Sequence, residues 1–355
     1  MLPLDGLRGI AILTVILLHA GIWRGGGVGV DLFFVLSGFL ITGILLDAKA
    51  AASTWQDYAW PFYVRRALRI FPVAFTALTL VFVVAPIAGL WPAAPFREQV
   101  WFWTYLSNWY AGPRSYAVLH LQHFWSLAVE EQFYLIWPLV MWHCSSRTVT
   151  RVCGVIVILV PILRMLVTVW HVPVSATVAA LAPTVLRFDG LAAGAWLAVA
   201  ARQPGGLGRW RPLAWCCLPL GVLLLRLTGD FSGAILIFAA ALIAAVTVDP
   251  RDPLSTFLTW RPLRWVGRVS YVVYIVHFPI AARLLGAGVS PPIILVVTVA
   301  VSLLIAAASW RWFEQPILAH KSRWPMPRAI PQESSSLPTG QLIERRILVH
   351  AHREP

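Results

Sequence analysis

Apolar runs of helix length recur from one end of this chain to the other, and they constrain its fold more than any other feature. A helix that crosses the hydrocarbon core of a bilayer needs about 20 predominantly apolar residues. About ten segments of the chain meet or approach this length. We therefore predict an all-α, polytopic membrane helix bundle with about ten transmembrane helices. They lie near residues 7–23, 27–47, 70–91, 124–143, 152–170, 186–201, 213–228, 232–248, 269–286 and 291–312.

Composition agrees with a membrane protein and excludes an ordinary soluble domain. Hydrophobic residues make up 59% of the chain and charged residues only 12%, whereas soluble domains carry about 25% charged residues. A secreted protein with a cleaved signal peptide is also excluded, because no short apolar segment is followed by a long polar domain.

The net charge of +13 indicates topology rather than nucleic-acid binding. The basic residues form clusters between apolar runs and not one stripe with interleaved aromatic residues, so no nucleic-acid partner is expected. Cytoplasmic loops of membrane proteins carry an excess of Lys and Arg. With the N-terminus in the cytoplasm, the clusters near Lys49, Arg147, Arg209 and Arg264 all fall on the cytoplasmic side, and the opposite loops hold few charges.

Two regions beside the spans have their own composition. From residue 321 the chain becomes polar and rich in Pro and Ser, so we predict a membrane domain over 1–320 and a polar, disordered cytoplasmic tail over 321–355. The external segment 92–123 holds Trp101, Trp103, Tyr105, Trp109 and Tyr110. Such a cluster forms either an interfacial belt or a stacking surface for a flat acceptor such as a sugar.

Arg8 and His19 are the first candidates for chemistry, since both lie in the first apolar run. Eleven residues correspond to about 1100° of helix rotation, so the two side chains share one face and lie about 16 Å apart along the axis. Asp5 falls about 40° from His19 by the same count. An ionisable side chain inside a membrane helix costs roughly 2.5–3.5 kcal/mol and usually faces the bundle interior. The alternative for His19 is a structural histidine that a neighbouring helix satisfies.

Ser37 and the arginines at 65–69 are candidates for substrate binding. Ser37-Gly38 either presents a hydroxyl to a ligand or simply lets two helices pack closely. Arg65, Arg66 and Arg69 lie at a predicted cytoplasmic edge of the membrane. They either anchor the topology or bind the phosphates of a nucleotide-like donor, because guanidinium groups bind phosphate with two parallel hydrogen bonds.

The segment His120 to Tyr134 carries two acids at the mouth of an apolar run. Glu130 and Glu131 are adjacent on a helix, so we expect one to be buried and the other to be wet. Trp125 and Tyr134 are further candidates for substrate contact. His120 and His123 have a metal-like spacing, but no third ligand is near, and we predict no metal site.

Two further stretches place polar residues at or inside a span. Arg187 and Asp189 mark either a charged entrance to a helix of small residues or a ligand contact. His277 is a second intramembrane histidine, with either a structural role or a place in the substrate cavity. The four cysteines, Cys144, Cys153, Cys216 and Cys217, form no Cys-x-x-Cys motif and imply no disulfide framework.

Taken together, these stretches resemble the acyltransferase-3 family of integral membrane O-acyltransferases. The resemblance covers about residues 1–320 and lies in five motifs that follow the family's order. They are Leu4-Asp5-Gly6-Leu7-Arg8-Gly9-Ile10-Ala11 with His19, Phe33-Phe34-Val35-Leu36-Ser37-Gly38-Phe39, Tyr63-Val64-Arg65-Arg66, Trp125-Ser126-Leu127 through Glu131-Gln132-Phe133-Tyr134, and Tyr271 through His277.

The resemblance implies an acyl-CoA-dependent O-acyltransferase in a bacterial cytoplasmic membrane, surrounded by membrane lipid. It would move an acyl group, commonly acetyl, from acyl-CoA to a hydroxyl of a carbohydrate or macrolide acceptor. Acyl-CoA is then a cosubstrate, and no tightly bound cofactor is expected. Arg8 and His19 would be the catalytic pair, and Glu131, or Glu130, would orient His19 or the acceptor.

The residues fit this chemistry by two routes that the sequence leaves open. His19 either takes the proton of the attacking hydroxyl or carries the acyl group itself. Arg8, Ser37 or backbone donors would stabilise negative charge on the carbonyl oxygen. The alternative function is an ion-coupled transporter that uses the same polar residues as a relay. That class usually shows matched halves with interrupted helices, and no internal repeat is visible here.

Overall fold

The computed structural model describes residues 2–110, 116–168, 184–228, 241 and 253–327, and in these parts the regular structure is entirely helical. Six helical segments are long and apolar enough to cross a membrane, which confirms the all-α membrane class. The helices are α1 Leu2–His19, α2 Val28–Ala51, α3 Trp55–Thr79, α4 Ala85–Ile87, α5 Phe96–Trp103, α6 Tyr116–Leu119, α7 Phe124–His143, α8 Ser146–Thr168, α10 Phe188–Ala200, α11 Arg211–Thr228, α13 Pro253–Leu258, α14 Arg261–Gly286, α15 Pro291–Ser309 and α16 Gln315–Ala319.

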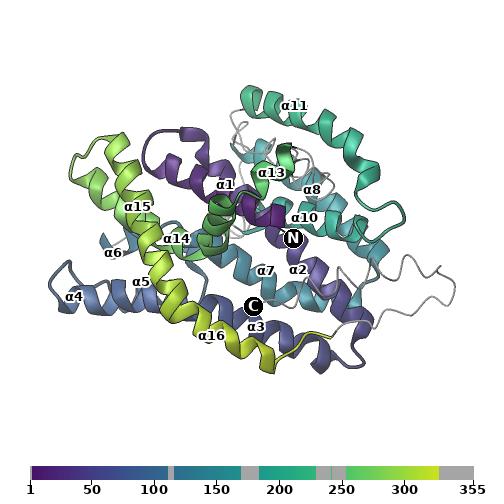
Figure 1. Ribbon diagram of the computed structural model, residues 1–355, viewed down its shortest axis with the longest axis horizontal. Coiled ribbons are helices and arrows are strands. Elements are labelled where there is room, and N and C mark those ends of the chain that lie inside the picture. The colour runs from purple at the N-terminus through teal and green to yellow at the C-terminus, as the bar shows by residue number, and fades with distance from the viewer. Residues whose placement is uncertain (1, 111–115, 169–183, 229–240, 242–252, 328–355) are drawn as a thin grey trace.

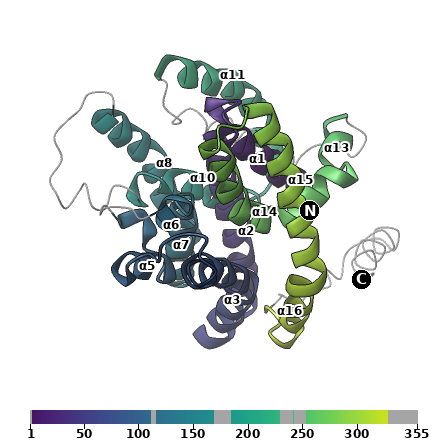
Figure 2. The same ribbon diagram turned by 90° about the vertical axis from the view of Figure 1, so that its left-hand side faces the viewer.

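Helices stand at nine of the ten predicted spans, and the tenth, near 232–248, lies outside the described residues except for residue 241. In both views α3 lies along one side of the bundle and α11 along the opposite side, with α1, α2, α7 and α10 between them (Figures 1 and 2). The short α10 is also apolar, and it packs between α2 and α8. The two central pairs, α1 with α14 and α2 with α10, make the most extensive contacts.

Glycines let the paired backbones approach more closely than any side chain would permit. A Cβ at Gly267 of α14 would lie 1.8 Å from the carbonyl oxygen of Asp5 on α1. A Cβ at Gly38 of α2 would lie 2.0 Å from the carbonyl oxygen of Leu191 on α10. Gly38 therefore serves helix packing, as one of the two interpretations of Ser37-Gly38 predicted.

The third span begins earlier than its hydropathy indicated. The helix starts at Trp55 rather than near residue 70, because the Thr54 side chain accepts a hydrogen bond from the Asp57 N–H and caps it. It continues through a π-helical stretch, Leu80–Val84, into α4. As a result Arg65, Arg66 and Arg69 lie inside a helix and not in the loop at the membrane edge. The first half escaped a search for apolar runs because Asp57, Arg65, Arg66 and Arg69 lower its hydropathy.

The last span continues beyond its predicted end at 312. From α15 the helix passes through a π-helical stretch, Trp310–Glu314, into α16 and then a 3₁₀ turn, His320–Arg323. Helix α16 runs beside α3, as Figure 1 shows. Residues 321–327, which we assigned to the tail, are described here and lie against α3, whereas 328–355 lie outside the described residues.

Candidate functional site

A small, partly open cavity lies among α1, α2, α3, α7 and α14. Its volume is about 90 Å³. The polar residues of its wall are Arg8, Ser37, Arg66, Arg69, Ser126, Glu130, Glu131, Tyr134, Ser270, Tyr271 and Tyr274. The structure thus brings together seven residues that the sequence singled out, from four separate motifs.

One hydrogen-bonded chain orders the carboxylate side of this cavity. The Ser37 hydroxyl donates to Glu130 Oε1 at 2.7 Å, and the Tyr134 hydroxyl donates to Ser37 Oγ at 3.0 Å. The Arg66 guanidinium lies over the Tyr134 ring, 4.7 Å from its centroid. Ser37 therefore takes part in the hydrogen bonds of the cavity, while its neighbour Gly38 takes part in helix packing.

Both glutamates line the cavity, which corrects the expectation that one is buried and the other is wet. Each is partly exposed, and Glu131 also borders a second pocket between α3 and α7. The adjacent positions can share the site because the cavity wraps around this turn of α7.

A larger, strongly basic pocket lies directly beside the cavity, and we call it the vestibule. Its volume is about 1010 Å³. Three residues, Arg8, Arg66 and Arg69, line both spaces and so form the boundary between them. Arg65, Lys321 and the acidic Asp47 line the vestibule but not the cavity.

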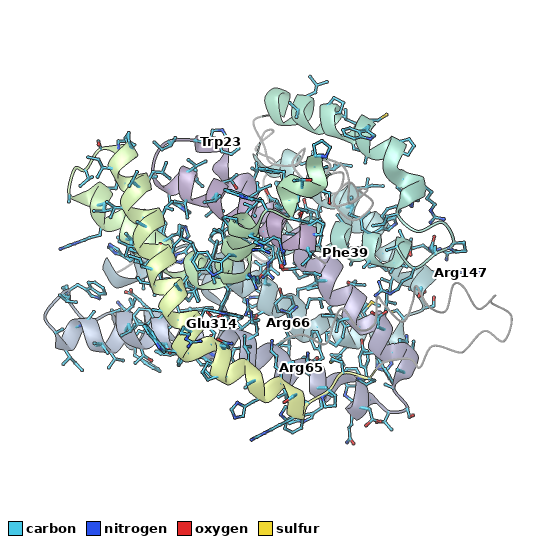
Figure 3. All side chains as sticks on the ribbon, in the orientation of Figure 1. Trp23, Phe39, Arg65, Arg66, Arg147 and Glu314 are labelled. Atoms are coloured by element: carbon cyan, nitrogen blue, oxygen red, sulfur yellow. The ribbon has the colours of Figure 1, made fainter. Side chains whose placement is uncertain are left out.

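The C-terminal helix completes the vestibule. Arg65 Nη1 donates to the carbonyl oxygen of Lys321 at 3.1 Å, and Arg69 Nη1 lies 3.6 Å from Glu314 Oε2. Figure 3 shows Arg65, Arg66 and Glu314 near one another on the side where α16 passes α3. Motif reading missed Glu314 and Lys321. An acid at the end of an apolar run was the available signal for Glu314.

The histidines form a separate cluster at the opposite end of α1 from Leu2. His19 is the last residue of the uninterrupted helix α1, so it lies three turns beyond Arg8 on nearly the same face. Its Nδ1 lies 3.0 Å from Nε2 of His277, and the His123 ring packs on His277 with centroids 5.4 Å apart. Glu131 lines the cavity, whereas the side chains in contact with the His19 ring include His277 and Phe278.

Two cavity residues connect the cavity with the histidine cluster. The Tyr274 hydroxyl lies 2.6 Å from Ser126 Oγ and donates to the carbonyl oxygen of His123 at 3.1 Å. The Tyr274 ring also packs against His277, with centroids 5.4 Å apart. Tyr274, itself part of the cavity wall, therefore lies between the cavity and His277.

A third pocket, of about 320 Å³, lies on the other side of Trp125. Its wall is formed by Phe102, Ser107, Asn108, Tyr110, Val118, Gln122, Trp125 and Arg187. The Arg187 guanidinium lies 5.2 Å from the centroid of the Trp125 ring and 3.5 Å from Asp31 Oδ1. We call it the outer pocket, since on the predicted topology it opens away from the cytoplasm.

The remaining predicted residues have structural surroundings. Asp189 is buried in an ion pair with Arg164, at 2.5 Å. Asp5 lies near the start of α1, close enough to Arg8 to attract it electrostatically. Of the metal-like pair, His120 stacks on Trp91, whereas His123 contacts His277. Among the described residues, no group of three or more His, Cys, Asp or Glu residues is placed to hold a metal ion.

The aromatic external segment packs inward more than a simple belt would. Trp101, Trp103, Tyr105 and Tyr110 pack on the same hydrophobic core cluster as α1 and α14. The Trp109 indole N–H donates to Thr184 Oγ1 at 2.7 Å. Tyr110 also lines the outer pocket, so part of this segment faces a polar recess.

Comparison with known proteins identifies the family of this chain. The chain belongs to the acyltransferase-3 family, whose acyltransferase-domain model matches residues 2–311. This confirms the resemblance inferred from the five motifs. No solved structure matches the chain significantly.

Several curated relatives carry names that mention O-acetyl transfer. A protein of Bacillus subtilis named "Putative peptidoglycan O-acetyltransferase YrhL" is 32% identical over 349 residues, covering 88% of this chain and 54% of the relative. The peptidoglycan O-acetyltransferase OatA of Listeria monocytogenes is 28% identical over 88% of this chain and 55% of its own length. The O-acetyltransferase OatA of Staphylococcus aureus is 28% identical over 88% and 56%. The chain therefore spans about half the length of the curated relatives that it matches.

Proposed function

We propose that this chain is a membrane O-acetyltransferase that uses acetyl-CoA as donor and a hydroxyl of a glycan as acceptor. The observation that carries the proposal is the boundary of Arg8, Arg66 and Arg69 between the vestibule and the cavity. Such an arrangement suits a donor with a polyanionic end and a small, neutral reactive end.

The vestibule suits the phosphates of the donor. Arg65, Arg66, Arg69 and Lys321 contribute cations from two helices to one space. Guanidinium groups bind phosphate oxygens with paired hydrogen bonds. The predicted topology also opens this space to the cytoplasm, where acyl-CoA is found.

The cavity suits an acetyl group. An acetyl group has three heavy atoms, and the cavity of about 90 Å³ beside the vestibule would hold it at the end of the donor's pantetheine arm. Tyr274 in the cavity wall lies between this position and the histidine cluster.

The chemistry requires a base and an electrophile. The acceptor oxygen attacks the thioester carbonyl carbon, the carbon–sulfur bond breaks, and the CoA thiolate leaves and takes up a proton. His19 accepts the hydroxyl proton, or carries the acetyl group in a two-step route. Arg8 and Ser37 would stabilise charge on the donor side of this path.

The outer pocket suits a sugar acceptor. Trp125 and Tyr110 offer ring faces, and Asn108, Gln122 and Arg187 offer polar groups. Peptidoglycan fragments are the first glycans to test, because the names of the Bacillus and Listeria relatives mention peptidoglycan. A macrolide would be the second acceptor class.

The test is acetyl transfer by the full chain in nanodiscs. The protein is incubated with radiolabelled acetyl-CoA and with peptidoglycan fragments, neutral oligosaccharides or macrolides, and each acceptor is then analysed for label. His19→Ala should lower turnover by roughly 100-fold or more at equal protein level. Full activity of that variant would remove His19 from the reaction. Ion-driven flux into proteoliposomes without label transfer would instead support the transporter, which family membership does not favour.

A further inference from the structure

We propose that His277 is a positioning residue that fixes the tautomer of His19 and leaves His19 Nε2 unprotonated. This inference rests on the proposed function, because it assigns His19 its state as a base or nucleophile. It uses a hydrogen-bond relation that neither the family match nor the names of the relatives describe.

The first step is the state of the His277 ring. Its Nδ1 lies 2.7 Å from the carbonyl oxygen of Tyr274 and 3.2 Å from that of Val273. A carbonyl oxygen can only accept a hydrogen bond, so Nδ1 of His277 carries the proton. The helix backbone of α14 thereby sets the tautomer of this side chain.

The second step concerns the charge of His277. The side chain is fully buried, and its ring neighbours are His19, His123, Tyr274 and Phe278. An imidazolium in such surroundings is unfavourable, because a buried charge needs a counter-charge and no carboxylate is among these contacts. A neutral ring with the proton on Nδ1 has a bare lone pair on Nε2.

The third step passes this state to His19. Nε2 of His277 lies 3.0 Å from Nδ1 of His19, and two lone pairs would repel each other at that distance. Nδ1 of His19 therefore carries the proton and donates to His277.

The consequence is a lone pair on Nε2 of His19, the nitrogen that points away from His277. This is the atom that takes a proton from a hydroxyl or attacks a carbonyl carbon. Phe278 packs edge-on against the His19 ring, with centroids 4.7 Å apart, and so limits rotation of the imidazole. His277 acts only through His19 and needs no contact with substrate.

The most direct test observes the histidine pair in the wild-type protein. ¹⁵N NMR of histidine-labelled full-length protein in lipid should show His19 protonated at Nδ1 and unprotonated at Nε2, with a His19→Gln sample used only to assign its signals. Protonation at Nε2 with a bare Nδ1 would overturn the inference, whether or not the protein transfers acetyl groups. Absence of acetyl transfer by the wild type would instead contradict the proposed function.

Variants test the functional half. His277→Phe keeps a ring but removes the acceptor, so kcat should fall by about 100-fold or more with an unchanged donor KM. His277→Gln keeps an acceptor oxygen within reach of His19 and should restore most of that loss. In a His19→Ala background, His277→Phe should have no additional effect.

The matched control is His120→Phe, which removes another buried histidine outside the cluster. It should leave kcat within about twofold of wild type. Equal activity of His277→Phe and wild type would contradict the inference. An additive loss in the His19→Ala background would do the same, because it would show that His277 acts independently.

Discussion

Arg69 on α3 and Glu314 at the end of the α15 segment lie 3.6 Å apart, although 245 residues separate them in the sequence. Arg69 also donates to the carbonyl oxygen of Arg268 at 3.1 Å. Glu314 is buried, so its carboxylate has little water to replace this partner. The pair joins the C-terminal helix to the arginine boundary of the cavity.

Glu314→Gln should therefore disturb Arg69 rather than the chemistry. We expect the donor KM to rise by roughly three- to tenfold, equivalent to about 0.7–1.4 kcal/mol, with a much smaller change in kcat. Steady-state kinetics with varied acetyl-CoA measures this split. Gln315→Ala, one residue further and exposed, is the control. A donor KM that is the same in both variants and the wild type would refute the positioning role.

Substitutions of Arg66 distinguish two roles for the arginines, binding of the donor phosphates and anchoring of the membrane topology. A clamp needs the two-pronged guanidinium, so Arg66→Ala should raise the donor KM about tenfold and Arg66→Lys should restore only part of it. A topology anchor needs charge alone, so Lys would substitute freely. Wild-type donor KM in both variants would mean that the donor binds elsewhere.

Lys321 tests whether the C-terminal turn belongs to the donor site. Its side chain lines the vestibule, whereas Arg323 in the same turn does not. Lys321→Ala should raise the donor KM several-fold, and the effect should shrink at high salt because exposed charges are screened. Arg323→Ala removes the same charge two residues away. Equal effects of the two variants would show a general electrostatic field and no local contact.

Substitutions of Trp125 test whether the outer pocket binds the acceptor. Loss of a stacking ring should weaken a sugar by about 1–2 kcal/mol, so Trp125→Ala should raise the acceptor KM about tenfold. Trp125→Phe should lose less. The donor KM serves as the internal control, since Trp125 lies outside the vestibule. A rise in donor KM alone would place the acceptor in another pocket.

Asp189 and Arg164 should matter for stability and not for substrate binding. Asp189→Asn leaves a buried guanidinium without its counter-charge and should destabilise the fold by about 3–5 kcal/mol. The double variant Asp189→Leu with Arg164→Leu removes both charges and should recover much of the thermal stability. Recovery is measured by the thermal unfolding of detergent-solubilised protein. If the double variant is less stable than Asp189→Asn, the pair has more than a local role.

The sequence carried the membrane class and the positions of most helices, because apolar runs report lipid contact directly. It placed the start of α3 about fifteen residues too late, since inward-facing charges at Arg65, Arg66 and Arg69 lower hydropathy even where a helix is continuous. Pairings across helices were also out of reach. Neither the contact of His19 with His277 nor that of Ser37 with Glu130 is visible in spacing along one chain.

Neighbouring residues of one sequence motif can also lie in different pockets. Trp125 faces the outer pocket while its neighbour Ser126 faces the cavity, because adjacent helical positions differ by about 100°. Asp189, which the sequence left open between a helix entrance and a ligand contact, is paired with Arg164, a residue in another apolar run. Opposite charges in two different apolar runs, Arg164 in one and Asp189 in the other, were the signal that could have suggested this pair.

The glycine contacts determine how the width of this bundle is maintained. At Gly267 and Gly38 the neighbouring helix is met by peptide atoms and not by side chains. The spacing of α1 from α14, and of α2 from α10, is therefore fixed by the van der Waals radii of backbone oxygen and carbon, which no rotamer change alters. Arg8 lies on α1 and Ser37 lies on α2, two helices held in this way. When the surrounding apolar side chains change rotamer, the spacing of these helices, and with it the position of the two polar residues, should stay the same.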